Sequence, residues 1–308
     1  MLDIYQYTLS KPIELEGKGL HSGIKSKIKI FPGQEDTGII FKRVDLKENN
    51  LVLANYKSVC SAKLCTTLKN EYNVEVSTVE HLLAALYISN IDNALIEINC
   101  KEVPIMDGSA KEFLNLLKKT KLKKQNAKRK YLKIVDKLNY SDGKKKISIQ
   151  PSNMSFEIYF QLDYENKIIG KQKNHVNFNK DNLEDIYNSR TFCLYKDIQK
   201  IKELGLAKGG SLDNAVVVDE DKILNKDGLR NSKEFVNHKI LDLAGDFMLS
   251  GYRVLGKVDC YHGGHKLTNQ FLRELFKFPK IYTEFQLKDI TVTKKVRENK
   301  PFKLAAIA

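Results

Sequence analysis

Three polar side chains lie four residues apart in a segment, from about residue 234 to residue 250, that has the apolar spacing of a long helix. They are His238, Asp242 and Asp246, which form one stripe of the predicted helix at 100° per residue. A histidine and a carboxylate one turn apart can ligate the same divalent cation. A solvated helix face has the same spacing and is more common, so the stripe alone leaves both interpretations open.

A second predicted helix places Glu80 next to His81, and His81 points away from the apolar stripe of that helix. Ser77 and Glu80 have the spacing of a capping box, which gives Glu80 a purely structural interpretation. The functional interpretation is an acid-base carboxylate beside a metal ion, with His81 as a third ligand. Two histidines, one aspartate and an open coordination position are typical of a catalytic zinc site.

Two more histidines follow glycine-rich segments. His21 comes after Gly17-Lys18-Gly19-Leu20, and His265 comes after Gly263-Gly264. Glycines allow a backbone to approach a ligand closely, although a lone Gly-Gly-His is more often a turn.

The composition indicates a folded globular protein. The chain has 308 residues, of which 42% are hydrophobic and 29% charged, which is enough for two domains. No apolar run reaches the roughly 18 residues that cross a bilayer, and the first residues lack the apolar core of a secretory signal, so we expect a cytoplasmic location. Five cysteines without a Cys-x-x-Cys pair indicate free thiols.

The formal net charge of +14 is concentrated in one part of the chain. Residues 118–146 contain thirteen basic and two acidic residues. We interpret residues 118–130, which have no acidic residue, as a solvated linker, in preference to a binding patch. A basic nucleic-acid-binding protein without catalysis is the alternative function, and it predicts salt-dependent binding without a metal.

The pattern of apolar residues predicts strands and helices in both halves of the chain. Alternation predicts strands that include Ile24, Ile28 and Ile30, then residues 94–98 and 156–162. A hairpin is expected where residues 131–135 and 147–149 flank Asp142-Gly143. Further helices are predicted from Ser109 and over residues 197–204 and 268–277. Because strict βαβ alternation is absent, we expect an α+β fold with two domains.

Seven sequence blocks carry a more specific signal, and they are Gly17-Lys18-Gly19-Leu20-His21-Ser22-Gly23, Leu64-Cys65-Thr66-Thr67-Leu68, Ser77-Thr78-Val79-Glu80-His81-Leu82-Leu83-Ala84-Ala85-Leu86, Val103-Pro104-Ile105-Met106-Asp107-Gly108-Ser109-Ala110, Ser189-Arg190-Thr191-Phe192, Gly209-Gly210-Ser211-Leu212-Asp213-Asn214-Ala215 and His238-Lys239-Ile240-Leu241-Asp242. In this order they resemble the UDP-3-O-acyl-N-acetylglucosamine deacetylases of lipid A synthesis. The resemblance spans about residues 10–278.

The resemblance implies a duplicated α+β fold, in which two similar two-layer domains with inserts hold the active site between them. Each domain has a sheet and two helices, and we expect them at residues 1–125 and 126–308. The implied cofactor is Zn2+, with Fe2+ as an alternative, and its ligands are His81, His238 and Asp242. The implied catalytic residues are Glu80 as the base, His265 as the general acid, Asp246 as the residue that orients His265, and Thr191 as a partner of the carbonyl oxygen.

The implied substrate is a UDP-linked acylated glucosamine, whose N-acetyl group is hydrolysed to a free amine and acetate in the committed step of lipid A synthesis. Residues 193–218 correspond to the family's insert, which forms an apolar passage for the acyl chain. Because the substrate has a fatty chain, we expect the protein to make peripheral contact with the inner membrane of a Gram-negative bacterium. We expect neither a nucleic-acid partner nor an oligomer. The expected substrate contacts are Phe192, Lys239, His21, Ile198, Ile201, Gly210, Ser211, Ala215 and Val217.

The chain departs from the family pattern at four places, none of which is a proposed ligand. Residues 251–253 lack an expected proline, residues 230–234 diverge before the ligand-bearing helix, and neither the lysine-rich segment nor the tail from residue 288 to residue 308 matches the pattern. A catalytically silent UDP-sugar sensor would be favoured by a missing ligand, and no expected ligand is missing.

Overall fold

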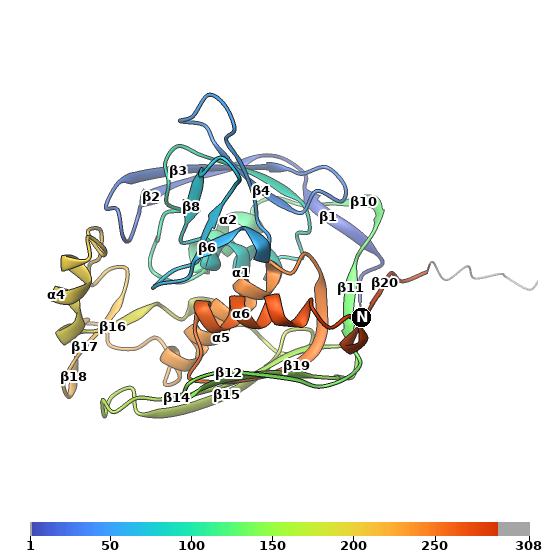
Figure 1. Cartoon of the computed structure of the whole chain (residues 1–308). Helices are drawn as coiled ribbons and strands as arrows, with labels where there is room; N and C mark the ends of the chain where they lie inside the picture. The colour runs from blue at the N-terminus through green and yellow to red at the C-terminus, as the bar shows by residue number, and fades with distance from the viewer. Residues whose placement is uncertain (1, 289–308) are drawn as a thin grey trace, which may run out of the picture.

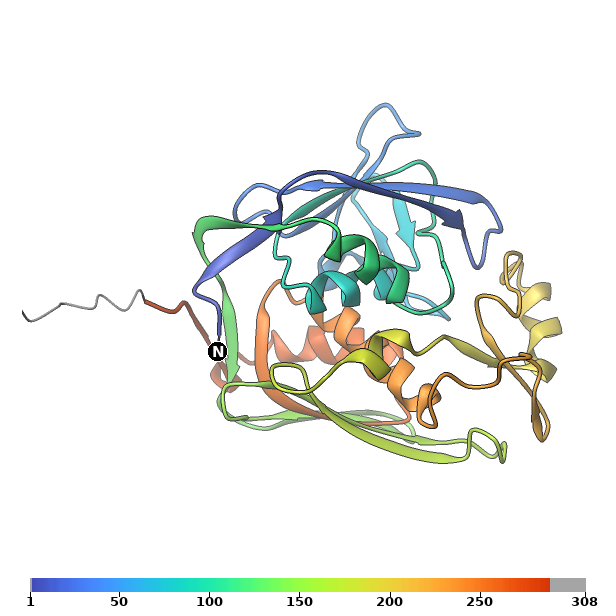
Figure 2. The same cartoon turned by 180° about the vertical axis from the view of Figure 1, so that it is seen from behind.

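Two larger β-sheets enclose a layer of helices in the computed structural model, which describes residues 2–288. Figures 1 and 2 show a mostly blue sheet from the first half of the chain on one side and a green sheet from the second half on the other. Helices from both halves lie between them. Within residues 2–288, no helix combines the length and the apolar content needed to span a bilayer.

The first half contributes a five-stranded sheet and two helices. The sheet has the order β2-β3-β9-β4-β5, formed by β2 (Ile13–Lys18), β3 (Lys25–Pro32), β9 (Ala94–Ile98), β4 (Ile39–Arg43) and β5 (Leu51–Leu53). Its helices are α1 (Glu80–Ile88) and α2 (Lys111–Lys118). The turn η1 (Tyr56–Ser58) precedes a small sheet of β6 (Val59–Ser61), β7 (Thr67–Lys69) and β8 (Glu75–Ser77), which leads into α1.

The second half contributes a larger sheet, three helices and a small insert with a fourth helix. The sheet consists of β11 (Tyr131–Ile134), β12 (Leu138–Asp142), β13 (Lys145–Gln150), β14 (Phe156–Asp163), β15 (Lys171–Asn177), β19 (Arg253–Tyr261) and β20 (Tyr282–Phe285). The helices are α3 (Glu184–Asn188), α5 (Glu234–Met248) and α6 (His265–Leu275), and η2 (Pro279–Ile281) is a single turn before β20. A three-stranded insert contains β16 (Phe192–Leu194), β17 (Val216–Asp219) and β18 (Lys222–Ile223), with α4 (Tyr195–Glu203) between its first two strands.

The two halves repeat one arrangement around a central strand. In the first half, β9 follows α1, pairs antiparallel with β3 and parallel with β4, and leads to α2. In the second half, β19 follows α5, pairs antiparallel with β13 and parallel with β14, and leads to α6. The predicted α+β fold with a duplicated sheet-and-helix unit is therefore confirmed.

The strand patterns follow from alternation, with one correction. In β14, Phe156, Ile158 and Phe160 are buried, and in β3 the same holds for Ile28 and Ile30. Burying each such side chain contributes about 1.5–3 kcal/mol. The inclusion of Ile24 in this set was wrong, because Ile24 precedes β3 and is 57% exposed. Its carbonyl accepts a hydrogen bond from the Gly19 amide and closes the loop between β2 and β3.

Helices α1 and α5 approach each other closely at the centre of the molecule. A Cβ at Gly245 of α5 would lie 2.1 Å from the Glu80 carbonyl oxygen and 3.2 Å from the Ala84 nitrogen. The small Ala84 therefore leaves room for the backbone of α5. This contact brings the first residues of α1 next to the polar stripe of α5.

Gly245→Ala is expected to lower the free energy of unfolding by about 1–3 kcal/mol, because the added methyl group separates α1 from α5. Helix propensity alone predicts the opposite sign, a stabilisation of about 1 kcal/mol. Urea denaturation followed by circular dichroism distinguishes the two. A more stable variant would show that α1 and α5 can move apart without a loss of free energy of unfolding.

The lysine-rich segment is a strand rather than the predicted solvated linker. Strand β10 (Leu122–Lys128) pairs antiparallel with β1 (Tyr5–Leu9). Lys123 and Lys124 are exposed on this strand, and the Lys124 ammonium lies 3.7 Å from the centroid of the Tyr5 ring. Backbone pairing with β1 makes a strand possible without an apolar periodicity. The expected domain boundary between residues 125 and 126 falls inside this strand.

The predicted hairpin has the right turn but the wrong first strand. Asp142 pairs with Lys145 across Gly143, and the strand before this turn is β12, not residues 131–135. Strand β11 instead lies between β19 and β20. Its side chains Tyr131, Leu132 and Ile134 are buried, so both faces of the strand are covered, as is typical of a central strand.

The predicted helices are present, with corrections at two N-termini. Helix α1 starts at Glu80, and its expected capping box is absent because the Ser77 amide donates to the Lys101 carbonyl while Ser77 lies in β8. Helix α6 starts at His265, three residues before the predicted start at residue 268. The expectation for the tail, from 289 onward, lies outside the described residues.

Candidate metal centre

His81, His238 and Asp242 converge where α1 meets α5. The Nε2 atom of His81 lies 3.4 Å from Oδ1 of Asp242, and Nε2 of His238 lies 3.3 Å from the same oxygen. The potential ligand atoms of the three residues lie within 4.8 Å of one another. All three side chains are buried, so the interpretation of the α5 stripe as a solvated face was wrong. Helix α5 is covered by α1, α6 and β14.

The donor set fits a divalent cation. Oδ1 of Asp242 is buried and has no hydrogen-bond partner within the described part of the chain, although two imidazole nitrogens face it. A buried carboxylate oxygen without a partner costs several kcal/mol unless a cation compensates it. Burial disfavours ionisation of Asp242, but the nearby His238, Lys239 and His265 outweigh burial and hold its pKa well below the usual range.

The protonation state of His238 also suits a ligand. Its Nδ1 lies 3.1 Å from the Ser189 carbonyl oxygen, which can only accept, so Nδ1 carries the proton and Nε2 presents a lone pair. Burial lowers the pKa of His238 to about 3, although Asp242 opposes the change. The ring is therefore neutral near pH 7, as metal ligation requires.

Glu80 is the first residue of α1 and points into the same centre. Its Oε2 accepts a hydrogen bond from the Thr66 amide at 3.1 Å, and its Oε1 lies 3.7 Å from Nε2 of His265. Burial raises the pKa of Glu80 above its usual value, while the charges of His265 and His81 oppose the rise. A carboxylate with a raised pKa is suited to proton transfer, and this is the role that the position of Glu80 favours over that of a helix cap.

His265 opens α6 and is held by Asp246 of α5. Its Nδ1 lies 2.8 Å from Oδ2 of Asp246, whose other oxygen accepts the Thr66 hydroxyl at 2.7 Å. Burial disfavours the charged imidazolium, but the carboxylates of Asp246, Glu80 and Asp242 outweigh burial and raise the pKa of His265 to about 10. His265 is therefore protonated at neutral pH and can donate a proton.

Lys239 and Phe192 lie at the edge of the centre. The Lys239 ammonium is 2.8 Å from Oδ2 of Asp242 and 5.6 Å from the centroid of the Phe192 ring. Burial opposes the charge of Lys239, but Asp242 outweighs burial and raises its pKa. A cation beside an aromatic ring can bind an anionic or sugar group.

An apolar cavity of about 630 Å³ is lined mostly by the insert and extends to Phe192, whose ring centroid lies 6.3 Å from that of His238. Its opposite wall is formed by Leu20 and Leu64 of the first half. The insert packs closely against the loop before His21, because a Cβ at Gly209 would lie 2.1 Å from the Gly19 carbonyl oxygen. Of the expected substrate contacts, the structure brings together in this lining His21, Phe192, Ile198, Ile201, Gly210, Ser211, Ala215 and Val217, together with Thr191, whereas Lys239 lies outside it.

Some residues of the centre were not identified from the sequence. Thr66 contacts both Glu80 and Asp246, and the Ser189 carbonyl contacts His238. Both residues lie in blocks on which the resemblance rests, and this was the available signal. Two of their contacts use the peptide backbone, which residue types do not reveal.

Comparisons with known proteins agree with this geometry. The family model described as UDP-3-O-acyl N-acetylglycosamine deacetylase matches residues 6–277. Relatives named UDP-3-O-acyl-N-acetylglucosamine deacetylase occur in Pasteurella multocida strain Pm70, with 44% identity over 88% of this chain and 89% of the relative, and in Shewanella frigidimarina strain NCIMB 400, with 41% identity over 88% and 90%. A third, from Idiomarina loihiensis, is 44% identical over 88% and 90% of the two chains. The chain belongs to the UDP-3-O-acyl N-acetylglycosamine deacetylase family.

Proposed function

We propose that this protein hydrolyses the N-acetyl group of a UDP-linked, 3-O-acylated N-acetylglucosamine to give a free amine and acetate, in the committed step of lipid A synthesis. The observation that carries the proposal is the placement of Glu80 and His265 beside Asp242, whose unpartnered oxygen faces two imidazoles. The names of the relatives supply the substrate class.

The resident ion in this proposal is Zn2+, with Fe2+ as the alternative, held by His81, His238 and Asp242. Nitrogen ligands from imidazole and one carboxylate oxygen suit both ions. When bound, such an ion polarises a carbonyl group and lowers the pKa of water to about 7.

Glu80 takes a proton from the attacking water as the new carbon–oxygen bond forms at the acetyl carbon. The negative charge that develops on the carbonyl oxygen is met in part by the Thr191 hydroxyl. His265, oriented and charged by Asp246, then gives its proton to the glucosamine nitrogen as the carbon–nitrogen bond breaks. The immediate products are the free amine and acetic acid, which becomes acetate by releasing a proton to solvent. The proton taken up by Glu80 equals the one given by His265, so atoms and charge balance.

The remaining residues bind the substrate in this proposal. Lys239 and Phe192 contact the sugar and its diphosphate, with His21 nearby, and the cavity inside residues 193–218 takes the acyl chain. In this proposal residues 1–125 and 126–308 are the two domains, and the metal ligands come from α1 of the first and α5 of the second. We propose a cytoplasmic location with peripheral contact with the inner membrane, from which a fatty-acylated substrate is taken.

The nucleic-acid alternative is not supported. Several basic groups of residues 118–146 already have partners. Lys118 lies over the Tyr187 ring, Arg129 pairs with Asp92, and Lys130 pairs with Asp36. A family of deacetylases explains the chain without a nucleic acid.

An acetate-release assay tests the function directly. The purified protein is expected to release acetate from UDP-3-O-acyl-N-acetylglucosamine, to lose this activity in a chelator and to regain it with Zn2+. Unchanged activity after the metal has been removed would refute the mechanism, and tight RNA or DNA binding without acetate release would favour the alternative function.

Asp246→Asn is expected to move the alkaline limb of the pH profile of kcat to lower pH. Asp246 exerts the strongest of the charge interactions that raise the pKa of His265, so its loss lowers that pKa, and the proton donor is lost at a lower pH. Stopped assays between pH 6 and pH 10 measure the limb. Asp45→Asn, which alters a carboxylate paired with Arg43, is the control and should leave the limb in place. An unshifted limb in Asp246→Asn would refute the proposed role of His265.

A further inference from the structure

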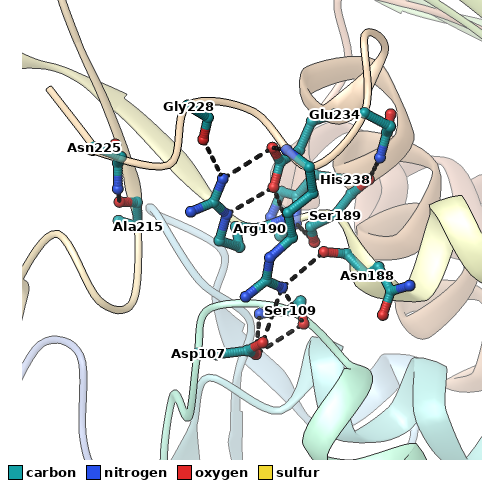
Figure 3. A network of polar contacts seen from close by, with 12 residues as sticks. Asp107, Ser109, Asn188, Ser189, Arg190, Ala215, Asn225, Gly228, Glu234 and His238 are labelled. Carbon is teal, nitrogen blue, oxygen red and sulfur yellow. Dashed lines mark hydrogen bonds and ion pairs between the residues drawn. The ribbon is translucent and has the colours of Figure 1, made fainter. Parts of the chain in front are cut away.

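One peptide group outside the proposed ligand set bridges two successive turns of α5. The carbonyl of Ser189 accepts from Nδ1 of His238 at 3.1 Å, and the amide of Arg190 donates to Oε1 of Glu234 at 3.0 Å. Both atoms belong to the same planar peptide unit. Glu234 and His238 lie one turn apart on α5, so the peptide is fixed to the helix at both ends, as Figure 3 shows.

Glu234 holds this peptide with a carboxylate that has little freedom to move. The residue is fully buried, and the Arg190 guanidinium binds it as a fork, with Nε at 2.8 Å from Oε1 and Nη2 at 3.1 Å from Oε2. Nη2 of Arg190 also donates to the Gly228 carbonyl at 2.7 Å, and the Arg230 amide donates to Oε2 of Glu234 at 2.7 Å. A buried ion pair held by several charge-assisted hydrogen bonds is rigid.

We propose that Glu234 and Arg190 are positioning residues for the metal ligand His238. By fixing the plane of the Ser189–Arg190 peptide, they aim its carbonyl at Nδ1 of His238, which selects the tautomer and ring orientation that turn Nε2 toward Asp242. Hydrogen bonds to the second nitrogen of a metal-bound histidine commonly set metal affinity in this way. The inference rests on the proposed function, because it takes His238 as a ligand.

The same peptide connects the His238 contact to the substrate side of the site. The next residue, Thr191, donates its amide to the Gly108 carbonyl at 2.8 Å and lines the apolar cavity. The Arg190–Glu234 pair therefore fixes a segment that has the His238 contact at one end and the Thr191 hydroxyl at the other.

A purely structural role for the pair makes a different prediction, and the chain offers a matched control. Asp92 is a carboxylate in an arginine ion pair outside the metal centre, with Arg129 at 2.7 Å and Arg253 at 3.2 Å. Loss of one partner of a buried pair commonly costs 3–5 kcal/mol. Both Glu234→Gln and Asp92→Asn should therefore lower stability, but only Glu234→Gln should change metal binding.

The experiment measures the Kd of the full-length apoprotein for Zn2+ by competition with a chelator, and stability by urea denaturation. Glu234→Gln is expected to raise the Kd by about 10- to 100-fold, and Asp92→Asn to leave it within about twofold of the wild-type value. An unchanged Kd in Glu234→Gln, or an equal rise in Asp92→Asn, would overturn the inference. A wild-type protein that does not bind Zn2+ would instead contradict the proposed function.

Arg190→Lys decides the question if Glu234→Gln does not fold. It keeps the positive charge and the peptide N–H but loses the fork, so it is expected to raise the Kd by a smaller factor, at least about threefold. The 15N shifts of the His238 ring in the apoprotein provide a second readout. They are expected to show the Nδ1-protonated tautomer in the wild type and a tautomer mixture in the variants. Wild-type shifts and Kd in Arg190→Lys would overturn the inference.

Discussion

Glu80→Gln is expected to lower kcat for acetate release by about 10²- to 10⁴-fold while leaving one metal ion bound per chain. The glutamine oxygen can still accept the Thr66 amide, which lies 3.1 Å from the wild-type carboxylate, so the start of α1 should keep its position. The neutral amide cannot take a proton from water. The change therefore removes the base without altering the proposed ligands, which are other side chains.

The kinetic result must be separated from a loss of folding or of metal. Metal content by emission spectroscopy and the free energy of unfolding should both stay near the wild-type values. Glu97→Gln, which removes a carboxylate of β9 that pairs with Lys42 of β4, is the control and should keep wild-type kcat. A Glu80→Gln variant with near-normal turnover would contradict the assignment of the base.

The ligand set could be predicted in part from spacing and in part only from resemblance. Helical periodicity brings His238 and Asp242 together, because four residues make about one turn. It cannot bring His81 to them, since that contact depends on the approach of α1 to α5 at Gly245. The polar stripe of α5 could also be interpreted as a solvated face. The amphipathic pattern of a single helix does not show that α1 and α6 cover its polar side.

The duplication of the fold has no counterpart in a sequence repeat. Strands β9 and β19 have the same pairing pattern, yet they share only the alternation of apolar side chains. A sheet requires backbone hydrogen bonds and a buried face, and many residue combinations meet these needs. The same reason explains the error at β10, whose pairing with β1 depends on backbone groups near the start of the chain rather than on a local apolar pattern.

His238→Ala is expected to lower the affinity for Zn2+ by more than about 100-fold, because a direct ligand contributes at least as much as the partners that orient it. The purified variant should contain far less than one metal ion per chain and release no measurable acetate. His175→Ala is the control, since His175 is a half-exposed residue of β15 that pairs with Glu157 of the neighbouring strand β14. It should keep both the metal and the activity.

Thermal stability gives this prediction a readout that does not depend on turnover. A ligand that binds only the folded chain stabilises it by RT ln(1 + [L]/Kd), which is about 2.7 kcal/mol when Zn2+ is at 100 times its Kd. Added Zn2+ should therefore raise the Tm of the wild-type apoprotein and of His175→Ala, but not that of His238→Ala. If His238→Ala kept one ion per chain and the same rise in Tm, the ion would be bound elsewhere and the proposed ligand set would be wrong. If it lost both while remaining folded, the unpartnered oxygen of Asp242 would have its explanation in the cation that His238 helps to hold.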